Sequence, residues 1–356
     1  MNGRPQLTKV LVTGGCGFIG SHFIRLLLRL HPEVAVTNVD KLTYAGNPGN
    51  LSDVVQAHGH NANALEYPRY RFVHGDICDR HLIGQLLEQE HVHAIVHFAA
   101  ETHVDRSIED STAFVRTNVL GTQILLEAAR SAWESEVPVY GGRNRHHRFL
   151  YISTDEVYGP SLAVQKFSEA SPLRPTSPYA ASKASGDMLC QSYAATYSMP
   201  IVIARLSNQY GPNQLQEKLI PKAISSLMCG HSIPIYARGQ EYRSWLFVED
   251  ACQALEQLLT QEIEHGAYNV PGFGERRNID LIQEIVRTFD CQTRRVGSSH
   301  IGATRFHFVK NPRGAAHDVG YKMKGDKIES EIGWTPSTSI EEGLRRTISW
   351  YLRNCE

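Results

Sequence analysis

Two short motifs in the middle of the chain carry side chains that could move protons. The first places Thr154, Asp155 and Glu156 directly after FLYIS, an apolar run of strand length. A buried strand that ends in this way delivers its polar side chains to the carboxyl edge of a sheet. The second motif places Tyr179 and Lys183 four residues apart, on one side of a predicted helix. Because an ammonium group favours the phenolate form of a nearby tyrosine, Tyr179 is a candidate proton acceptor.

The helix that carries Tyr179 has a recognisable start. Ser177 is a predicted N-cap, and Pro178 suits the first turn because it lacks a backbone N–H. We expect this helix to continue to about Tyr197 and to be followed by a buried strand from Ile201 to Leu206.

A glycine-rich turn near the amino terminus predicts a dinucleotide site. The strand pattern KVLVT is followed directly by GGCGFIG and then by the apolar-periodic segment SHFIRLLLRL. Gly14, Gly17 and Gly20 would allow a tight turn, close approach of a pyrophosphate and close packing of the helix. The spacing GxxGxxG is looser than GxGxxG, and glycine turns also serve as plain connections. A second sequence feature is therefore needed to support a dinucleotide site.

Asp40 supplies that feature. It ends the next predicted strand, VAVTNVD, twenty residues after Gly20. A carboxylate there can accept hydrogen bonds from the adenosine ribose and repels a 2′-phosphate, so the pattern favours NAD over NADP. The alternative is a solvated acid at a strand end, which the glycine loop upstream makes the weaker interpretation.

Strands that alternate with helices at this spacing predict an α/β fold. We expect a Rossmann-type doubly wound parallel sheet with the NAD site and the catalytic residues in residues 1–206. Residues 207–356 are expected to form mainly a smaller α/β substrate-binding lobe, with chain crossing back into the first domain. Further expected elements are a strand over 70–76, helices over 81–90 and 113–131, a strand over 94–99, a helix over 221–229, strands over 233–236 and 245–248, and helices over 250–259, 279–289 and 340–353.

Composition limits the kind of partner. Lys plus Arg (36) nearly equals Asp plus Glu (37), so charge predicts neither nucleic-acid nor membrane-surface binding. The seven cysteines include no CxxC pair, which favours reduced thiols in a cytosol. The amino terminus has no apolar leader pattern, and no apolar run could span a bilayer. We expect a cytoplasmic protein.

The segment from Trp133 to Arg148 is expected to be a surface loop. It contains two adjacent glycines and the pair His146-His147. Two histidines could suggest a metal site, but no further ligands are spaced to join them, so we predict no metal.

Longer motifs identify a resemblance. The segments TGGCGFIG, NVDKLTYAGN, RYRFVHGDICD, HFAAETHVDRSI, STDEVYG, SPYAASKAS, SNQYGP, EKLIP, RSWLFVED and IGWTP resemble the nucleotide-sugar 4,6-dehydratases of the extended short-chain dehydrogenase/reductase family. The resemblance runs from about Lys9 to Trp350. The YxxxK pair and the glycine loop are common to that superfamily, whereas the Thr-Asp-Glu triplet is typical of its dehydratases. Related sugar epimerases usually carry small or hydroxyl residues in place of Asp155 and Glu156.

The resemblance implies a role for each catalytic candidate. Tyr179 would take the proton of the C4 hydroxyl while the C4 hydride passes to NAD, and Lys183 would hold the phenolate and the nicotinamide ribose. Glu156 would remove the C5 proton, Asp155 would protonate the departing C6 hydroxyl, and the hydride would return to C6. Thr154 would bond the C4 oxygen. Two carboxylates that act as base and acid need different pKa values, which their surroundings can provide.

The resemblance also implies two sets of binding residues. The NAD set is Gly14, Gly17, Phe18, Ile19, Gly20, Asp40, Lys41, Leu42, Thr43, Asp76, Ile77, Phe98, Ala99, Ala100, Thr102, Thr117, Tyr179, Lys183 and Gln209. The substrate set is Thr102, Thr154, Asn208, Lys218, Leu219, Arg243, Asn278, Arg313 and His317, with the cations facing the diphosphate.

Three segments depart from the family pattern. Gln209 stands where a second Asn is usual, and its longer side chain is expected to alter the contact with NAD. Leu215-Gln216 replaces an aromatic residue and a proline before EKLIP. The usual Arg-Pro-Gly-His-Asp appears as Arg-Gly-Ala-Ala-His-Asp over 313–318, with Gly320 where an Arg is common. The nucleotide contacts of this segment are therefore expected to differ.

The expected substrate is a nucleoside diphosphate glucose, and the expected assembly is a homodimer, as in the family. The sequence leaves open whether the base is thymine or uracil, because one methyl group is worth only about 1 kcal/mol. Two alternatives remain. A sugar-nucleotide 4-epimerase needs Tyr179 and Lys183 but not Asp155 and Glu156, and a catalytically silent NAD-binding regulator needs none of the four.

Overall fold

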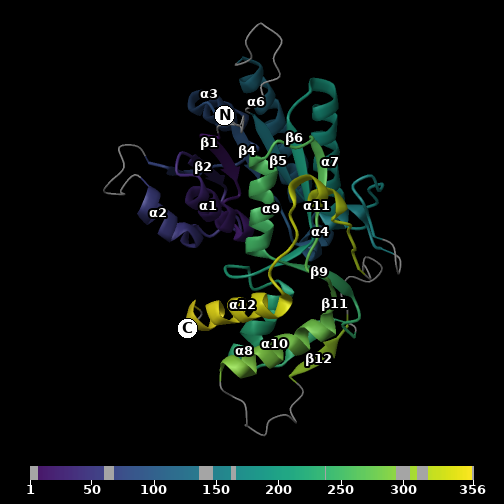
Figure 1. Ribbon diagram of the computed structural model, residues 1–356. Helices are drawn as coiled ribbons and strands as arrows, with labels where there is room; N and C mark the ends of the chain where they lie inside the picture. Colours follow the sequence, from purple (N-terminus) through teal and green to yellow (C-terminus); the bar gives the residue numbers. More distant parts are fainter. Residues whose placement is uncertain are drawn as a thin grey trace.

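A seven-stranded parallel sheet forms the centre of the molecule (Figure 1). The computed structural model describes residues 7–59, 68–135, 147–161, 166–236, 238–293, 305–310 and 320–354. The strand order is β10-β6-β5-β4-β1-β2-β3, and every pair is parallel. The strands are β1 (Lys9–Thr13), β2 (Ala35–Asp40), β3 (Tyr70–His74), β4 (Ala94–His97), β5 (Arg148–Thr154), β6 (Ile201–Leu206) and β10 (Gly266–Val270).

Helices cover both faces of this sheet, as a doubly wound fold requires. Helices α1 (Phe18–Leu30) and α9 (Val248–Thr260) share one apolar core with alternate strand residues, including Leu150 of β5. Helices α3 (Arg80–Glu90), α6 (Thr122–Ser135) and α7 (Pro178–Tyr197) share the core on the other face, which contains Tyr151. The expected Rossmann-type parallel sheet is confirmed.

A separate apolar core lies in the carboxyl-terminal part of the chain. It is built from α8 (Leu219–Met228), β8 (Ile233–Tyr236), α10 (Asn278–Gln292) and α12 (Ile340–Asn354). In Figure 1 these helices gather below the large sheet. Two small sheets accompany them: β7 (Asn208–Tyr210), β9 (Tyr242–Phe247) and β11 (Glu275–Arg277) form one, and β8 with β12 (Phe306–Val309) forms the other.

The chain returns to the large sheet after it has entered this second region. Helix α9 packs beside α1, and β10 pairs with β6 along the edge of the sheet. Residues beyond 206 therefore contribute to both cores. The division at 206/207 remains a prediction, which the strand topology alone does not test.

Seven short helical elements lie between the larger strands and helices of the described chain. They are η1 (Pro48–Leu51), α2 (Ser52–His58), α4 (Val104–Glu109), α5 (Thr112–Phe114), η2 (Val115–Gly121), η3 (Asp155–Tyr158) and α11 (Asp326–Ile332). Element η2 is a π-helix, so the expected regular helix over 113–131 is wrong in its first part. Wider π turns often occur at functional sites, and Thr117 of η2 lines the cavity described below.

Three further expectations need correction. Strand β3 ends at His74, two residues before Asp76, so Asp76 lies in the following turn. Trp133 belongs to α6, and His147 is buried with its ring stacked on Trp133 at 4.9 Å between centroids. The two ends of the expected surface loop are therefore packed against the core, because aromatic and imidazole rings bury well together. His146 lies outside the described residues.

No helix within the described ranges is long and apolar enough to cross a membrane.

Candidate active site

A cavity of about 680 Å³ opens at the carboxyl ends of the parallel strands. Its wall includes Gly14 after β1, Asp40 of β2, Phe98 after β4 and Thr154 of β5, together with side chains from the second region. Pockets for ligands usually have volumes of about 300 to 1,000 Å³, and open α/β sheets bind ligands at this edge. The cavity is therefore the candidate active site.

The cofactor end of the cavity is formed mainly by backbone. Gly14 has φ +71°, and a Cβ there would lie 2.6 Å from the backbone nitrogen of Ala99. A Cβ on Gly20 would lie 2.6 Å from the Gly14 carbonyl oxygen. Helix α1 begins after Gly17 without a side-chain cap, which leaves its first N–H groups available to an anion. These features fit the pyrophosphate of a dinucleotide.

Asp40 organises the next turn. Its two carboxylate oxygens accept hydrogen bonds from the backbone N–H groups of Cys16 (2.9 Å) and Leu42 (2.8 Å). Burial raises the pKa of Asp40, and these two hydrogen bonds oppose that effect. Leu42 has φ +54° and does not line the cavity, so its contribution is this backbone contact. The arrangement fixes the Asp40 carboxylate in the wall of the cavity, as the predicted NAD site requires.

An ion pair borders the same end. Lys41 Nζ lies 2.8 Å from Asp76 Oδ2. Burial would raise the pKa of Asp76, but the hydrogen bonds from Lys41 and from the backbone of Cys78 outweigh it and lower that pKa. The other expected cofactor residues also line the cavity: Phe18, Ile19, Thr43, Ile77, Ala99, Ala100, Thr102, Thr117 and Gln209.

Helix α7 brings Tyr179 and Lys183 to the cavity. The Ser177 hydroxyl accepts from the Ala180 N–H at 3.1 Å, and Pro178 occupies the first turn, which confirms the predicted start. Tyr179 and Lys183 are both buried and both line the cavity. Lys183 Nζ donates to the Ile152 carbonyl oxygen at 2.6 Å, which fixes the ammonium group against strand β5.

The protonation of this pair is governed by burial. Burial and the nearby Glu156 raise the pKa of Tyr179, while a hydrogen bond with Thr154 lowers it. Burial lowers the pKa of Lys183 to about 8, and Cys190 and Asp187 oppose that shift. Burial therefore dominates the pKa of Tyr179, and the effect of the Lys183 ammonium group on the phenolate stays a prediction. A further positive charge would favour proton acceptance by Tyr179.

Residues 154–156 form the turn from β5 into η3. The Thr154 hydroxyl accepts from the Glu156 N–H at 3.3 Å and lies 3.2 Å from Asp155 Oδ1. Thr154 and Glu156 line the cavity, and Asp155, which stands between them in the chain beside the cavity, is 2% exposed and keeps its Oδ2 atom without a hydrogen-bond partner. Burial and the adjacent Glu156 raise the pKa of Asp155 to about 7, and the charge of Arg243 opposes them. Asp155 can therefore hold a proton near neutral pH, as a general acid must.

The substrate end is formed by side chains from the second region. Asn208, Lys218, Leu219, Arg243 and Asn278 all line the cavity. Arg243 lies with its guanidinium carbon 4.9 Å from the centroid of the Tyr321 ring. Leu215 and Gln216, which depart from the family pattern, line the cavity as well. Arg313 and His317 lie outside the described residues.

The site also contains residues that sequence reasoning missed. Arg106 stacks on the Tyr44 ring at 3.8 Å, and the Glu217 carboxylate lies 3.6 Å from His103 and 3.7 Å from Arg106. Lys218 joins this cluster by donating to the Thr102 carbonyl oxygen at 3.4 Å. Glu217 directly precedes Lys218 in EKLIP, and that adjacency was the available signal.

Unpaired polar atoms gather at the substrate end. Ten buried side-chain atoms in the described residues have no hydrogen-bond partner. Seven of them belong to the cavity or to Asp155 beside it: Asp155 Oδ2, Ser207 Oγ, Asn208 Oδ1, Gln214 Oε1, Glu217 Oε1, Trp245 Nε1 and Asn278 Oδ1. An unpaired buried polar atom costs about 1 to 3 kcal/mol, so this concentration fits a site whose polar ligand supplies the missing bonds. Among the described residues, no group of three or more His, Cys, Asp or Glu side chains is arranged to hold a metal.

Comparison with known proteins adds the chemical context. The sequence model of the family described as GDP-mannose 4,6 dehydratase matches residues 11–347. A dTDP-glucose 4,6-dehydratase from Neisseria meningitidis serogroup B is 41% identical over 353 residues, which cover 98% of this chain and 94% of that protein.

Solved structures show the same similarity. The crystal structure of DesIV, a dTDP-glucose 4,6-dehydratase from Streptomyces venezuelae with NAD bound, superposes with a TM-score of 0.83 at 39% identity and covers 97% of each chain. A UDP-glucose 4-epimerase from Thermus thermophilus in complex with NAD has a TM-score of 0.79 at 24% identity, over 98% of this chain and 100% of that one. The epimerase likeness shows the fold alone.

Proposed function

The chain belongs to the GDP-mannose 4,6 dehydratase family, and we infer that it converts dTDP-glucose to dTDP-4-keto-6-deoxyglucose with NAD as its cofactor. One observation in the structure supports this function most strongly. A buried Asp155 and a cavity-lining Glu156 stand beside Tyr179 and Lys183 at one sheet edge. An epimerase uses the second pair alone, so the carboxylates favour a dehydratase.

The first half-reaction is oxidation at C4. NAD, when bound, supplies the hydride acceptor and a positive charge in the site. We assign proton removal from the C4 hydroxyl to Tyr179, with Thr154 bonding the same oxygen. The ammonium group of Lys183, fixed on the Ile152 carbonyl oxygen, favours the phenolate that proton transfer requires.

The second half-reaction is loss of water across C5 and C6. The C4 ketone acidifies the C5 proton, and Glu156 removes it because its side chain reaches the cavity. Asp155 gives its proton to the C6 hydroxyl, which leaves as water while the C5–C6 double bond forms. Hydride then returns to C6 and a proton returns to C5, so the net change is loss of one water. The raised pKa of Asp155 suits its role as the acid.

We assign substrate binding to the second region of the chain. Lys218 and Arg243 supply positive charge for the diphosphate, and Asn208 and Asn278 bring unpaired amide oxygens. Arg313 and His317 are proposed to join them. This distribution supports the division into an NAD-binding part over 1–206 and a mainly substrate-binding part over 207–356.

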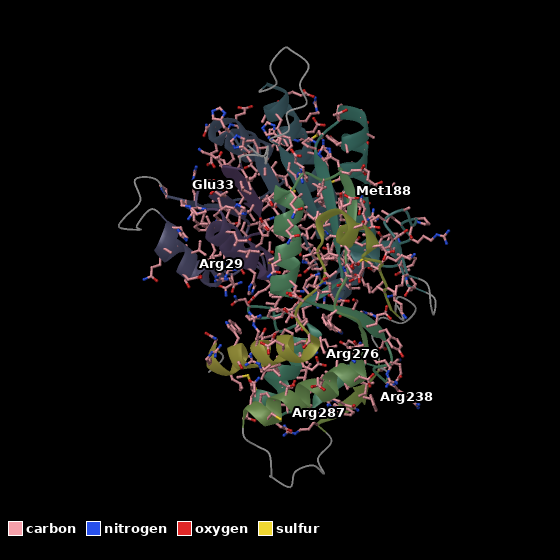
Figure 2. The ribbon with its side chains drawn as sticks, viewed as in Figure 1. Arg29, Glu33, Met188, Arg238, Arg276 and Arg287 are labelled. Atoms are coloured by element: carbon pink, nitrogen blue, oxygen red, sulfur yellow. The ribbon has the colours of Figure 1, made fainter. Side chains whose placement is uncertain are left out.

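We further propose a cytoplasmic homodimer. Val115 and Leu120 of η2 and Met188 of α7 are 54%, 44% and 61% exposed, and these two helices pack together. Figure 2 shows Met188 at the edge of the molecule. Large apolar side chains exposed on two neighbouring helices are typical of an interaction site. Light scattering should give a dimer for the parent chain and a monomer for Met188→Glu. A monomeric parent chain would contradict this assembly.

The function is tested by supplying two substrates. We expect dTDP-glucose to yield a product lighter by one water in mass spectrometry, and UDP-glucose to react more slowly. Equal rates would contradict the thymine preference, and no loss of water from either would contradict the dehydratase function.

A further inference from the structure

A buried hydrogen-bond network lies directly beneath the catalytic turn. Its centre is the pair Arg205 and Asp187, whose side chains are 2% and 0% exposed. Arg205 Nε donates to Asp187 Oδ2 at 2.8 Å and its Nη2 donates to Oδ1 at 2.9 Å. Burying two charges is costly unless their geometry and remaining hydrogen bonds compensate. The rest of the network supplies those bonds.

Two branches of the network end at the two ends of the catalytic turn, and a third bond joins Arg205 to the Glu169 carbonyl oxygen at 3.2 Å. Arg205 Nη1 donates to the Tyr158 hydroxyl at 2.7 Å, and Tyr158 is the last residue of η3, the turn that carries Asp155 and Glu156. Asp187 Oδ2 accepts from the hydroxyl of Ser153, the residue before Thr154, at 3.3 Å. The network therefore holds the catalytic turn at both of its ends.

The other side of the network reaches the oxidation pair and the second region. Asp187 lies one helical turn after Lys183 on α7. The Tyr158 hydroxyl donates to Asn269 Oδ1 at 2.7 Å, and Asn269 belongs to β10, the strand that returns from the second region. The backbone N–H of Asn269 donates to Glu169 Oε1 at 2.9 Å. Three segments that lie far apart in the sequence, η3, β6 and β10, thus meet at the Tyr158 hydroxyl group.

We propose that Asp187, Arg205, Tyr158 and Asn269 are positioning residues for the elimination step, an inference that rests on the proposed function. Tyr179 and Lys183 lie on α7 itself, whereas Asp155 and Glu156 lie on a turn that has only four residues. The network fixes that turn against α7, and so sets where the acid and the base lie relative to the C4 oxidation pair. A misplacement of about 1 Å can cost a hundredfold in rate.

Tyr158→Phe is the sharpest test. It removes the hydroxyl that joins Arg205 to Asn269 but keeps the ring, which stacks on Phe167 with centroids 5.1 Å apart. With dTDP-glucose, we expect near-ultraviolet absorbance from C4 oxidation to rise at the parent rate. Its decay and the formation of product should be about tenfold to a hundredfold slower.

Tyr268→Phe is the matched control. Tyr268 precedes Asn269 on β10, and its hydroxyl bonds the Glu264 carbonyl oxygen at 2.8 Å and the Glu331 carboxylate, both away from the network. We expect parent kinetics from this variant. Thermal unfolding of each variant, measured with and without NAD, separates loss of stability from misplacement.

Ser153→Ala keeps the proposal testable if Tyr158→Phe does not fold. It should leave the rise of absorbance at the parent rate and slow its decay by a smaller factor than Tyr158→Phe does. Decay at the parent rate, or rise and decay slowed by one common factor, would overturn the positioning role and leave the network a structural one. A parent enzyme that forms no dehydrated product would instead overturn the proposed function, and this inference with it.

Discussion

The two ends of the cavity are built in different ways. At the cofactor end, polar groups satisfy one another: both oxygens of Asp40 accept backbone N–H groups, and Lys41 pairs with Asp76. At the substrate end, Asn208, Asn278 and other side chains keep buried polar atoms without partners. The cofactor end is therefore organised before its ligand arrives, whereas the substrate end reaches its full set of hydrogen bonds only with the ligand.

This difference predicts which kind of substitution impairs each end of the cavity. The substrate end and the turn beside it should respond to the loss of one functional group. The cofactor end should respond to the addition of a single methyl group, because backbone approaches backbone there. Four substitutions test this contrast.

Glu156→Gln should have the largest effect. It keeps the shape of the side chain but cannot accept a proton, and losing a general base typically costs about 10² to 10⁴ in rate. C4 oxidation does not need Glu156, so substrate should produce near-ultraviolet absorbance from reduced cofactor with little dehydrated product. A Glu156→Gln enzyme that dehydrates at the parent rate would remove Glu156 from the mechanism.

Asp155→Asn should change how stability depends on pH. The pKa of Asp155 is raised from 3.8 to about 7 by burial and by Glu156. Between these values the folded state binds one more proton than the unfolded state, so the free energy of unfolding falls as pH rises. The fall amounts to about 4 kcal/mol across the window and is complete above about pH 7.

The variant lacks this titration, so urea unfolding from pH 4 to 8 should show the parent losing stability relative to Asp155→Asn. Elimination by the parent should also slow above about pH 7, as Asp155 loses its proton. Parallel stability curves for the two proteins would show that Asp155 titrates normally.

Gly14→Ala tests the cofactor end. Its positive φ alone costs about 1 to 3 kcal/mol for a residue with a side chain, and the 2.6 Å approach of the new Cβ to Ala99 adds to that cost. NAD affinity should fall sharply. Gly84→Ala in α3 is the control, because a Cβ there meets nothing within 4 Å. Unchanged NAD affinity in Gly14→Ala would contradict the close-approach account.

Arg243→Ala should have the smallest effect of the four. Losing a charged hydrogen bond to the diphosphate should weaken substrate binding by roughly 1.5 to 3 kcal/mol and leave NAD binding nearly unchanged. Arg276→Ala is a matched control, because Arg276 lies opposite Arg243 in the pairing of β11 with β9 but does not line the cavity, is 52% exposed and forms an ion pair with Glu341. Equal calorimetric affinities for both variants would place Arg243 outside the site.

The same contrast explains what the sequence could predict. The cofactor end depends on local patterns: the glycine spacing, the strand that ends at Asp40 and the helix start at Ser177 each lie within a few residues. These patterns predicted the parallel sheet and residues that line the cavity. Asp40 at the end of its strand predicted the choice of NAD, and the family resemblance predicted the reaction; both agree with the relatives described above.

Contacts between residues far apart in the sequence could not be predicted from these local patterns. No local pattern shows that Asp155 is almost fully buried while Glu156 lines the cavity, because the difference depends on how η3 packs against α7 and β10. The same holds for Glu217, whose partners His103 and Arg106 are more than 100 residues away in the chain. Burial, which is the largest influence on the pKa values of Tyr179 and Lys183, could not be judged from their spacing either.

The contact of residues 313–318 with the nucleotide stays a prediction. If Arg313 reaches the substrate, Arg313→Ala should raise KM more than it lowers kcat, which is the mark of lost uniform binding. Steady-state kinetics with dTDP-glucose would decide this, and a pure kcat defect would count against the contact.

The central claim is that this site oxidises C4 and then eliminates water with Glu156 and Asp155. The most direct measurement is the reaction of the parent enzyme with dTDP-glucose in heavy water, analysed by mass spectrometry and NMR. The account predicts a 4-keto-6-deoxy sugar nucleotide that has lost one water and carries solvent deuterium at C5. A sugar nucleotide of unchanged composition, epimerised at C4, would contradict it.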